Sequence, residues 1–232
     1  MTRAVPDGSE KKVCFRRVPP PITAGILWFT MAASDIVEFD DIIPTLYQNQ
    51  IEAELTSDHM AWHFRLDPGR TVSVLGSSGP DAIYAGFTNT VFHVENAGAP
   101  PSLVTALLLP LLFTYCDKAK IPFTRLLRIR LGLYPRIMLE AAHHPHVDFY
   151  VPHQNALYYV NDADGDTVLY EETFEDVPQP ALPGYLRDGR FKVAKLITPK
   201  KGRMVGFDGR RYHASMHPMK ATHRIAIAFS FQ

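Results

Sequence analysis

Apolar and polar residues alternate with a period of two in residues 125–134, where leucine or isoleucine occupies each odd position from 127 to 133. This pattern is typical of a β-strand with one buried face. Comparable short runs follow in the C-terminal half, and turn signals such as Asp164-Gly165 and Pro183-Gly184 separate them. The pattern predicts strands at 125–134, 136–141, 155–161, 166–171, 191–198, 203–207 and 223–231.

The N-terminal part of the chain has a different pattern of apolar and polar residues. A short apolar run at 26–29 predicts a strand. Residues 41–55 have apolar side chains at helical spacing, with Asp41 as the expected N-cap and Pro44 in the first turn. We therefore expect a helix over this segment.

A second helix is expected to begin after Ser102, which is a favourable N-cap, and to extend to about Lys118. Pro110 should kink this helix or end it early, because proline cannot donate the backbone hydrogen bond that a helix interior requires. The apolar part of the segment falls short of the ~20 residues that cross a bilayer. We interpret it as a buried helix that packs on a sheet.

Many short strands separated by turns favour a sandwich or a jelly roll. A chain of 232 residues is long enough to form one domain with a sizeable core. We expect a mainly β fold with flanking helices, in which residues 1–121 form a helical and β support region and residues 122–232 form a jelly-roll core. The proline-rich segment 176–190 predicts a loop over the mouth of the barrel.

The overall charge and the cysteine content exclude some classes of protein. The chain has no formal net charge and a pI of about 7.2, which argues against a protein that mainly coats nucleic acid. The two cysteines lie far apart and form neither a zinc-binding nor a disulfide pattern, and the polar N-terminus does not resemble a secretory signal. These features predict a cytoplasmic protein with no membrane partner. We interpret the basic cluster of the strand-rich half as a solvated strand face rather than a substrate-binding patch; it consists of Arg125, Arg128, Arg130 and Arg136.

Three residues form the candidate metal site. His146 and Asp148 stand two positions apart, a spacing that places both side chains on one face of a strand. His213, much later in the chain, can complete the set if a barrel brings the two segments together. Two imidazoles and one carboxylate are the facial triad of non-haem Fe(II) enzymes, which leaves open positions on the metal. The sequence therefore predicts an Fe(II) site at His146, Asp148 and His213.

The other histidines near these segments have different expected roles. His217 is a rival for the distal ligand, but it precedes a proline in what reads as a loop, so we prefer His213. His143 and His144 are expected at the rim of the site. His153 is expected to have a structural role near the entrance.

The last predicted strand places a cation inside the barrel. In residues 223–231, isoleucine and phenylalanine form one face, whereas Arg224, Ala226 and Ala228 lie on the other. A buried guanidinium is costly without an anion, and its planar fork suits a carboxylate. The inward position of Arg224 therefore predicts a site for an anionic ligand. The alternative is an ordinary salt bridge between Arg224 and a carboxylate of the protein.

Four segments of this chain resemble the 2-oxoglutarate/Fe(II)-dependent dioxygenases, and within them the prolyl 4-hydroxylase-like branch. The resemblance spans roughly the last third of the chain. Its segments are HPHVD (144–148), ALYYVNDADGDTVLY (156–170), PKKGRMVGFDGRRYHAS (199–215) and HRIAIAFSF (223–231).

The resemblance implies a double-stranded β-helix (jelly-roll or cupin-like) fold with Fe(II), 2-oxoglutarate as co-substrate and O2. It implies that His146, Asp148 and His213 are the metal ligands. It implies that Arg224 and Tyr159 bind the far carboxylate of 2-oxoglutarate. For Tyr159, the alternative is an aromatic residue of the hydrophobic core. No catalytic side chain beyond the metal ligands is expected.

The function implied is hydroxylation of an unactivated C–H bond in a peptidyl (prolyl-like) or amino-acid-like small-molecule substrate. The carboxylate at Asp148 favours hydroxylation over halogenation, because halogenating relatives have a small residue there. Nucleic-acid demethylation is disfavoured, since the last strand contains no second arginine after Arg224. The alternative is a jelly-roll ligand-binding module or a cupin-type metalloenzyme that does not use 2-oxoglutarate.

Overall fold

The computed structural model describes residues 36–66, 85–96, 98, 102–137 and 142–232, and the strand expected at 26–29 lies outside these residues. No described helix is long and apolar enough to cross a membrane. The helices are α1 (Thr45–Leu55), α2 (Leu103–Ala119) and α3 (Leu182–Arg187), with a 3-10 turn η2 (Val94–Asn96). The strands are β1 (Val37–Phe39), β2 (His63–Leu66), β3 (Ala85–His93), β4 (Leu126–Pro135), β5 (Gln154–Tyr159), β6 (Thr167–Thr173), β7 (Val193–Ile197), β8 (Met204–Asp208), β9 (Arg211–Ser215) and β10 (His223–Phe231).

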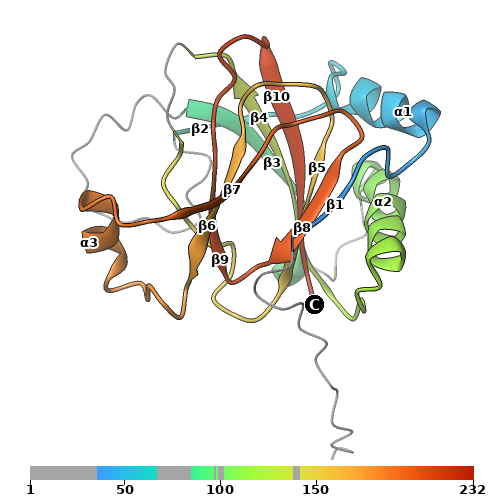
Figure 1. Cartoon of the computed structure of the whole chain (residues 1–232). Helices are drawn as coiled ribbons and strands as arrows, with labels where there is room; N and C mark the ends of the chain where they lie inside the picture. Colours follow the sequence, from blue (N-terminus) through green and yellow to red (C-terminus); the bar gives the residue numbers. More distant parts are fainter. Residues whose placement is uncertain (1–35, 67–84, 97, 99–101, 138–141) are drawn as a thin grey trace, which may run out of the picture.

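The strands form two sheets in which every described pairing is antiparallel. The larger sheet has the order β1-β8-β5-β10-β4-β3-β2, and the smaller sheet has the order β7-β6-β9. Apolar side chains from both sheets, among them Leu157, Phe207, Leu169 and Ile197, pack together between them. The prediction of a mainly β fold with flanking helices is confirmed, and Figure 1 shows α1 and α2 beside the larger sheet.

Strand β10 has the two faces that its sequence predicts. Ile225, Ile227, Phe229 and Phe231 are buried in a cluster with residues of α1 and α2. The opposite face, which carries Arg224, therefore points toward the smaller sheet. The bounds of β10 agree with the predicted strand at 223–231.

Helix α2 begins where Ser102 predicts, because the Ser102 hydroxyl accepts a hydrogen bond from the backbone N–H of Thr105 at 3.0 Å. The prediction that Pro110 ends this helix early is wrong, since the helix continues to Ala119. Pro110 lies on the exposed side of the helix, so water can satisfy the carbonyl that it leaves without a donor. Packing of the buried face, which includes Tyr115, outweighs the loss.

The start of α1 differs from the expectation. Pro44 is the N-cap and Thr45 the first helical residue, so Asp41 does not cap the helix. Asp41 instead has a positive φ of 48°, and its carboxylate accepts a hydrogen bond from the side chain of Gln48 at 3.2 Å. The strand predicted at 136–141 lies partly outside the described residues, and residues 136 and 137 are not in a strand.

The proline-rich segment 176–190 contains α3 and does not form a simple loop over the barrel mouth. Val177 and Leu182 are buried against Val168, Tyr212 and Ala214, which alternate with the inward-facing residues of β6 and β9. The segment thus covers the outer face of the smaller sheet. In Figure 1, α3 lies on the side of the molecule opposite α1 and α2.

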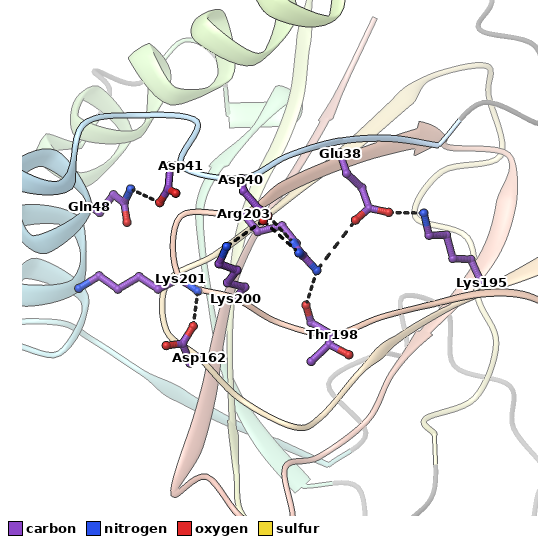
Figure 2. A network of polar contacts seen from close by, with 10 residues as sticks. All are labelled: Glu38, Asp40, Asp41, Gln48, Asp162, Lys195, Thr198, Lys200, Lys201 and Arg203. Atoms are coloured by element: carbon purple, nitrogen blue, oxygen red, sulfur yellow. Dashed lines mark hydrogen bonds and ion pairs between the residues drawn. The ribbon is translucent and has the colours of Figure 1, made fainter.

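A network of charged residues attaches the short edge strand β1 to its surroundings (Figure 2). Glu38 forms an ion pair with Lys195 of β7. Asp40, which follows β1, accepts hydrogen bonds from Lys200 at 2.8 Å and from Nε of Arg203 at 2.7 Å. These two partners lower the pKa of Asp40 to about 2. The network supplements the three paired residues of β1.

Candidate metal centre

The three predicted ligands meet at the edge of the smaller sheet, beside β9. The backbones of His146 and His213 form an isolated antiparallel bridge, with N–O distances of 3.0 and 2.9 Å. Val147, between the two upstream ligands, is buried in the outer cluster with α3, so its neighbours His146 and Asp148 point inward. One ligand atom from each of the three residues lies within 4.8 Å of the others.

Both imidazoles are oriented by backbone carbonyls. Nδ1 of His146 lies 3.1 Å from the carbonyl oxygen of His144, and Nδ1 of His213 lies 3.3 Å from that of Arg211. Because a carbonyl oxygen can only accept, each Nδ1 carries the proton and each Nε2 keeps its lone pair. Hydrogen bonds of this kind fix the tautomer and ring direction of metal-binding histidines. The two Nε2 atoms are thus prepared to bind a cation.

The protonation states also suit a metal. Burial lowers the pKa of His146 to about 3, and the neighbouring His213 acts in the same direction. Burial lowers the pKa of His213 as well. Burial opposes ionisation of Asp148, but Arg128 and the two imidazoles hold the pKa of this carboxyl well below its usual range. Two neutral imidazoles and one carboxylate are the donor set that Fe(II) takes in facial triads, and the site fits this ion.

Arg128 forms an ion pair with Oδ1 of Asp148, and the two side chains are only 6% and 5% exposed. The other oxygen, Oδ2, lies 3.8 Å from Nε2 of His213. The interpretation of Arg128 as part of a solvated strand face is therefore wrong, and Arg130 also lines the interior cavity. Only Arg125 and Arg136 of the predicted basic cluster are exposed. Alternation gives two faces, and here the charged face of β4 is the one that points into the barrel.

A cavity connects the triad with Arg224. Arg224 is 1% exposed, and its Nη2 donates to the hydroxyl of Thr167 at 2.7 Å. Within the described part of the chain, Nε and Nη1 of Arg224 have no hydrogen-bond partner. Ala226 and Ala228, which follow Arg224 on the same face, also line the cavity and keep it open. A buried cation with two unused donor atoms fits an anionic ligand.

Tyr159 lies beside Arg224, but it is not among the residues that line the cavity. Its ring centroid is 5.4 Å from Cζ of Arg224, and its hydroxyl donates to Thr167 at 2.7 Å. Tyr134 forms the cavity wall, with its ring 5.1 Å from the same guanidinium. Neither Tyr134 nor Thr167 was assigned to the site from the sequence. The sequence did offer one signal for Thr167. It lies two residues before the apolar Leu169 on the same strand, so both side chains are expected on the inward face.

His217, His143 and His153 do not belong to the group of three that could hold a metal. His217 bonds through Nδ1 to the carbonyl oxygen of Pro135 at 2.7 Å, and its ring stacks on His143 at 5.0 Å. His143 is 1% exposed, so the prediction of a rim position is wrong for it. His153 is buried, bonds to the carbonyl oxygen of Val151 at 2.7 Å, and packs against Gly209, where any side chain would collide with its ring.

No family model matches the chain, and no curated protein matches its sequence. Solved structures do match. The alpha ketoglutarate dependent epimerase SnoN from nogalamycin biosynthesis is 12% identical, with a TM-score of 0.56 over 85% of this chain and 77% of that one. AviO1 from Streptomyces viridochromogenes is 14% identical, with a TM-score of 0.54 over 84% and 88%.

A third match is the prolyl hydroxylase from Trichoplax adhaerens in complex with a hypoxia inducible factor peptide fragment. It is 16% identical, with a TM-score of 0.52 over 84% of this chain and 82% of that one. At these identities the likeness concerns the fold. The chain has the double-stranded β-helix fold of the 2-oxoglutarate/Fe(II) oxygenases, which confirms the predicted fold class.

Proposed function

We propose that this protein is a 2-oxoglutarate- and Fe(II)-dependent dioxygenase. The observation that carries the proposal is that one cavity is lined both by the His-Asp-His triad and by the buried guanidinium of Arg224. A metal site alone would fit many jelly-roll proteins. A metal site next to an inward cation with two unused donor atoms fits a bidentate keto acid that has a second carboxylate.

His146 and His213 would hold the metal through Nε2, and Asp148 would hold it through Oδ2. Three protein ligands leave positions for the keto acid and for dioxygen. When bound, Fe(II) with 2-oxoglutarate and O2 supplies an oxidation of an unactivated C–H bond that is coupled to the release of succinate and CO2. The protein contributes the ligand geometry, the anion site and a cavity that restricts water.

Arg128 has a supporting role at the metal. Its ion pair occupies Oδ1 of Asp148 and leaves Oδ2 on the side of His213. The same pair keeps the carboxylate ionised in a buried site. We infer that Arg128 directs one oxygen of Asp148 toward the metal, as residues that contact metal ligands commonly do.

Arg224 would bind the far carboxylate of 2-oxoglutarate. Thr167 holds one nitrogen of the guanidinium, and Tyr159 in turn donates to Thr167, so the group is fixed before the ligand arrives. A preorganised fork loses less entropy on binding than a free side chain. In this assignment Tyr159 acts through Thr167, and Ala226 and Ala228 leave room for the carbon chain.

The fold neighbours support this class of chemistry, since one is named an alpha ketoglutarate dependent epimerase and another a prolyl hydroxylase. Those names cover different outcomes, so hydroxylation and an amino-acid-like or peptidyl substrate rest on the sequence resemblance. The alternative, a cupin-type metalloenzyme without a keto acid, gives no reason for the unused donor atoms of Arg224.

Anaerobic titration tests the proposal. Adding 2-oxoglutarate to the protein with Fe(II) should produce the weak visible charge-transfer band of the chelate. His146→Ala should abolish the band, and Arg224→Met should weaken 2-oxoglutarate binding by about tenfold or more, because a charged hydrogen-bonding partner is lost. Arg125→Met, which changes an exposed arginine of the same cluster, is the matched control. A protein that binds Fe(II) but shows no band would favour the alternative.

A further inference from the structure

Asn161 holds the backbone on both sides of Arg224. Its side-chain oxygen accepts a hydrogen bond from the N–H of Ile225 at 2.8 Å, and its side-chain nitrogen donates to the carbonyl oxygen of His223 at 2.9 Å. These partners fix which end of the amide is the oxygen, because a backbone N–H can only donate and a carbonyl oxygen can only accept. Asn161 therefore contacts the two residues that flank Arg224.

The amide of Asn161 extends the pairing of β10 past the end of β5. The two strands pair up to Tyr159, where β5 ends, and the N–H of Val160 adds a bond to the carbonyl oxygen of Ile225 at 3.0 Å. The chain bends at residues 160 and 161. The side chain of Asn161, rather than its backbone, then makes the next two bonds to β10. On its other side, β10 pairs with β4 as far as its first residue.

The turn that follows Asn161 packs against the segment that leads into β10. The carboxylate of Asp164 accepts hydrogen bonds from the backbone N–H groups of residues 219–221 at distances between 2.9 and 3.1 Å. Gly165 lies so close to this segment that a Cβ would meet the carbonyl oxygen of Met216 at 2.6 Å. These contacts hold the turn in place and, with it, the side chain of Asn161 against β10.

The side chain of Arg224 depends on the same part of the chain at both of its ends. Asn161 holds the backbone, and Thr167, which begins β6 directly after the turn, accepts a hydrogen bond from Nη2 of Arg224 at 2.7 Å. Nε and Nη1 of Arg224 are buried and have no hydrogen-bond partner among the described residues. An arginine fixed at its backbone and at its tip keeps these two donors in one place, so little conformational entropy is lost when a carboxylate binds them.

We propose that Asn161 is a positioning residue of the co-substrate site, whose two backbone bonds set the place from which Arg224 reaches the far carboxylate of 2-oxoglutarate. This inference rests on the proposed function and deepens it. Asn161 is not among the residues that line the cavity, so it acts through Arg224 rather than on the ligand. Binding groups need supporting contacts that hold them within about 0.5 Å of the productive geometry. The metal ligands lie on other segments, so removing the amide of Asn161 should leave the metal site intact.

The experiment compares two keto acids on the anaerobic protein with Fe(II). 2-Oxoglutarate and 2-oxovalerate have the same chelating group and the same number of carbon atoms, but 2-oxovalerate ends in a methyl group in place of the far carboxylate. Their affinities, read from the charge-transfer band, therefore separate the anion site from the metal site. Asn161→Ala should weaken 2-oxoglutarate binding about fivefold or more and leave 2-oxovalerate binding within about twofold.

Asn89→Ala is the matched control, because it removes a 2.8 Å hydrogen bond from an asparagine of β3 to the distant carbonyl oxygen of Ala61. It should change neither affinity. A second comparison uses Arg224→Met as the background. There Asn161→Ala should have little further effect on 2-oxoglutarate binding, since the group that Asn161 positions is already gone.

Three results would overturn the inference: Asn161→Ala leaves the affinity for 2-oxoglutarate unchanged, it weakens both keto acids equally, or its full effect persists in the Arg224→Met background. If Asn161→Ala does not fold, Asn161→Ser takes its place. The serine hydroxyl is too short to contact both partners, so the same selective loss is expected. Absence of the band in the unmodified protein with 2-oxoglutarate would instead contradict the proposed function, so the two failures are distinguishable.

Discussion

Replacing Arg128 with leucine would leave the Asp148 carboxylate buried without its main counter-charge. The two side chains are 6% and 5% exposed, so water cannot take the place of the guanidinium. Removing one partner of a buried ion pair typically costs about 3–5 kcal/mol of unfolding free energy. We expect the metal-free Arg128→Leu protein to lose about 3 kcal/mol. For a chain of this size the melting temperature should fall by about 6–12 °C.

The assay is urea unfolding of the metal-free protein in the presence of a chelator. A double-mutant cycle with Asp148→Asn isolates the pair, because removing the charge of the carboxylate should make the loss of Arg128 much less costly. Arg125→Leu changes an exposed arginine and should alter stability by about 0.5 kcal/mol or less. If Arg128→Leu is as stable as the Arg125 control, or the cycle gives no coupling energy, Arg128 does not hold Asp148 as described.

Three further predictions concern the metal, the anion site and the edge strand. His146→Ala and His213→Ala should each abolish Fe(II)-dependent succinate release while circular dichroism stays unchanged; activity retained in either variant would reject that ligand. Thr167→Val removes the hydrogen bond that fixes Arg224, so 2-oxoglutarate should bind about fivefold more weakly by anaerobic titration, and an unchanged affinity would contradict the role of Thr167. Asp40→Asn should cost less than about 1 kcal/mol at pH 7, because the group is partly exposed. The pKa of Asp40 is about 2 in the folded state against 3.8 unperturbed, so urea unfolding should show this contribution above pH 4 and lose it as pH falls toward 2; a difference independent of pH would argue against the ion pairs.

The sequence predicted well the features that depend on local pattern. The two faces of β10 follow from strict alternation, and the position of Arg224 on the inward face follows with them. The HxD spacing predicted that His146 and Asp148 share a side, although the structure has a single bridge there rather than a regular strand. Ser102 predicted the start of α2 because an N-cap is a local interaction.

The features that the sequence missed depend on contacts between distant segments. Alternation in β4 could not say that its arginines face inward, because the partner of Arg128 is a carboxylate twenty residues later. Strand β9 is short and follows a turn, so the strand context of His213 became visible only through its pairing with β6. His143 is buried because its ring stacks on His217, far along the chain. Helix α3 is stabilised by packing on the smaller sheet rather than by its own sequence, which is rich in proline and glycine.

A crystal structure of the protein prepared without oxygen, with Fe(II) and 2-oxoglutarate, tests the central claim most directly. Anomalous scattering should locate iron bonded to Nε2 of His146, to Nε2 of His213 and to one oxygen of Asp148. The keto acid should chelate the same ion, with its far carboxylate on Arg224. Iron bound away from these three side chains, or a far carboxylate that does not reach Arg224, would contradict the account.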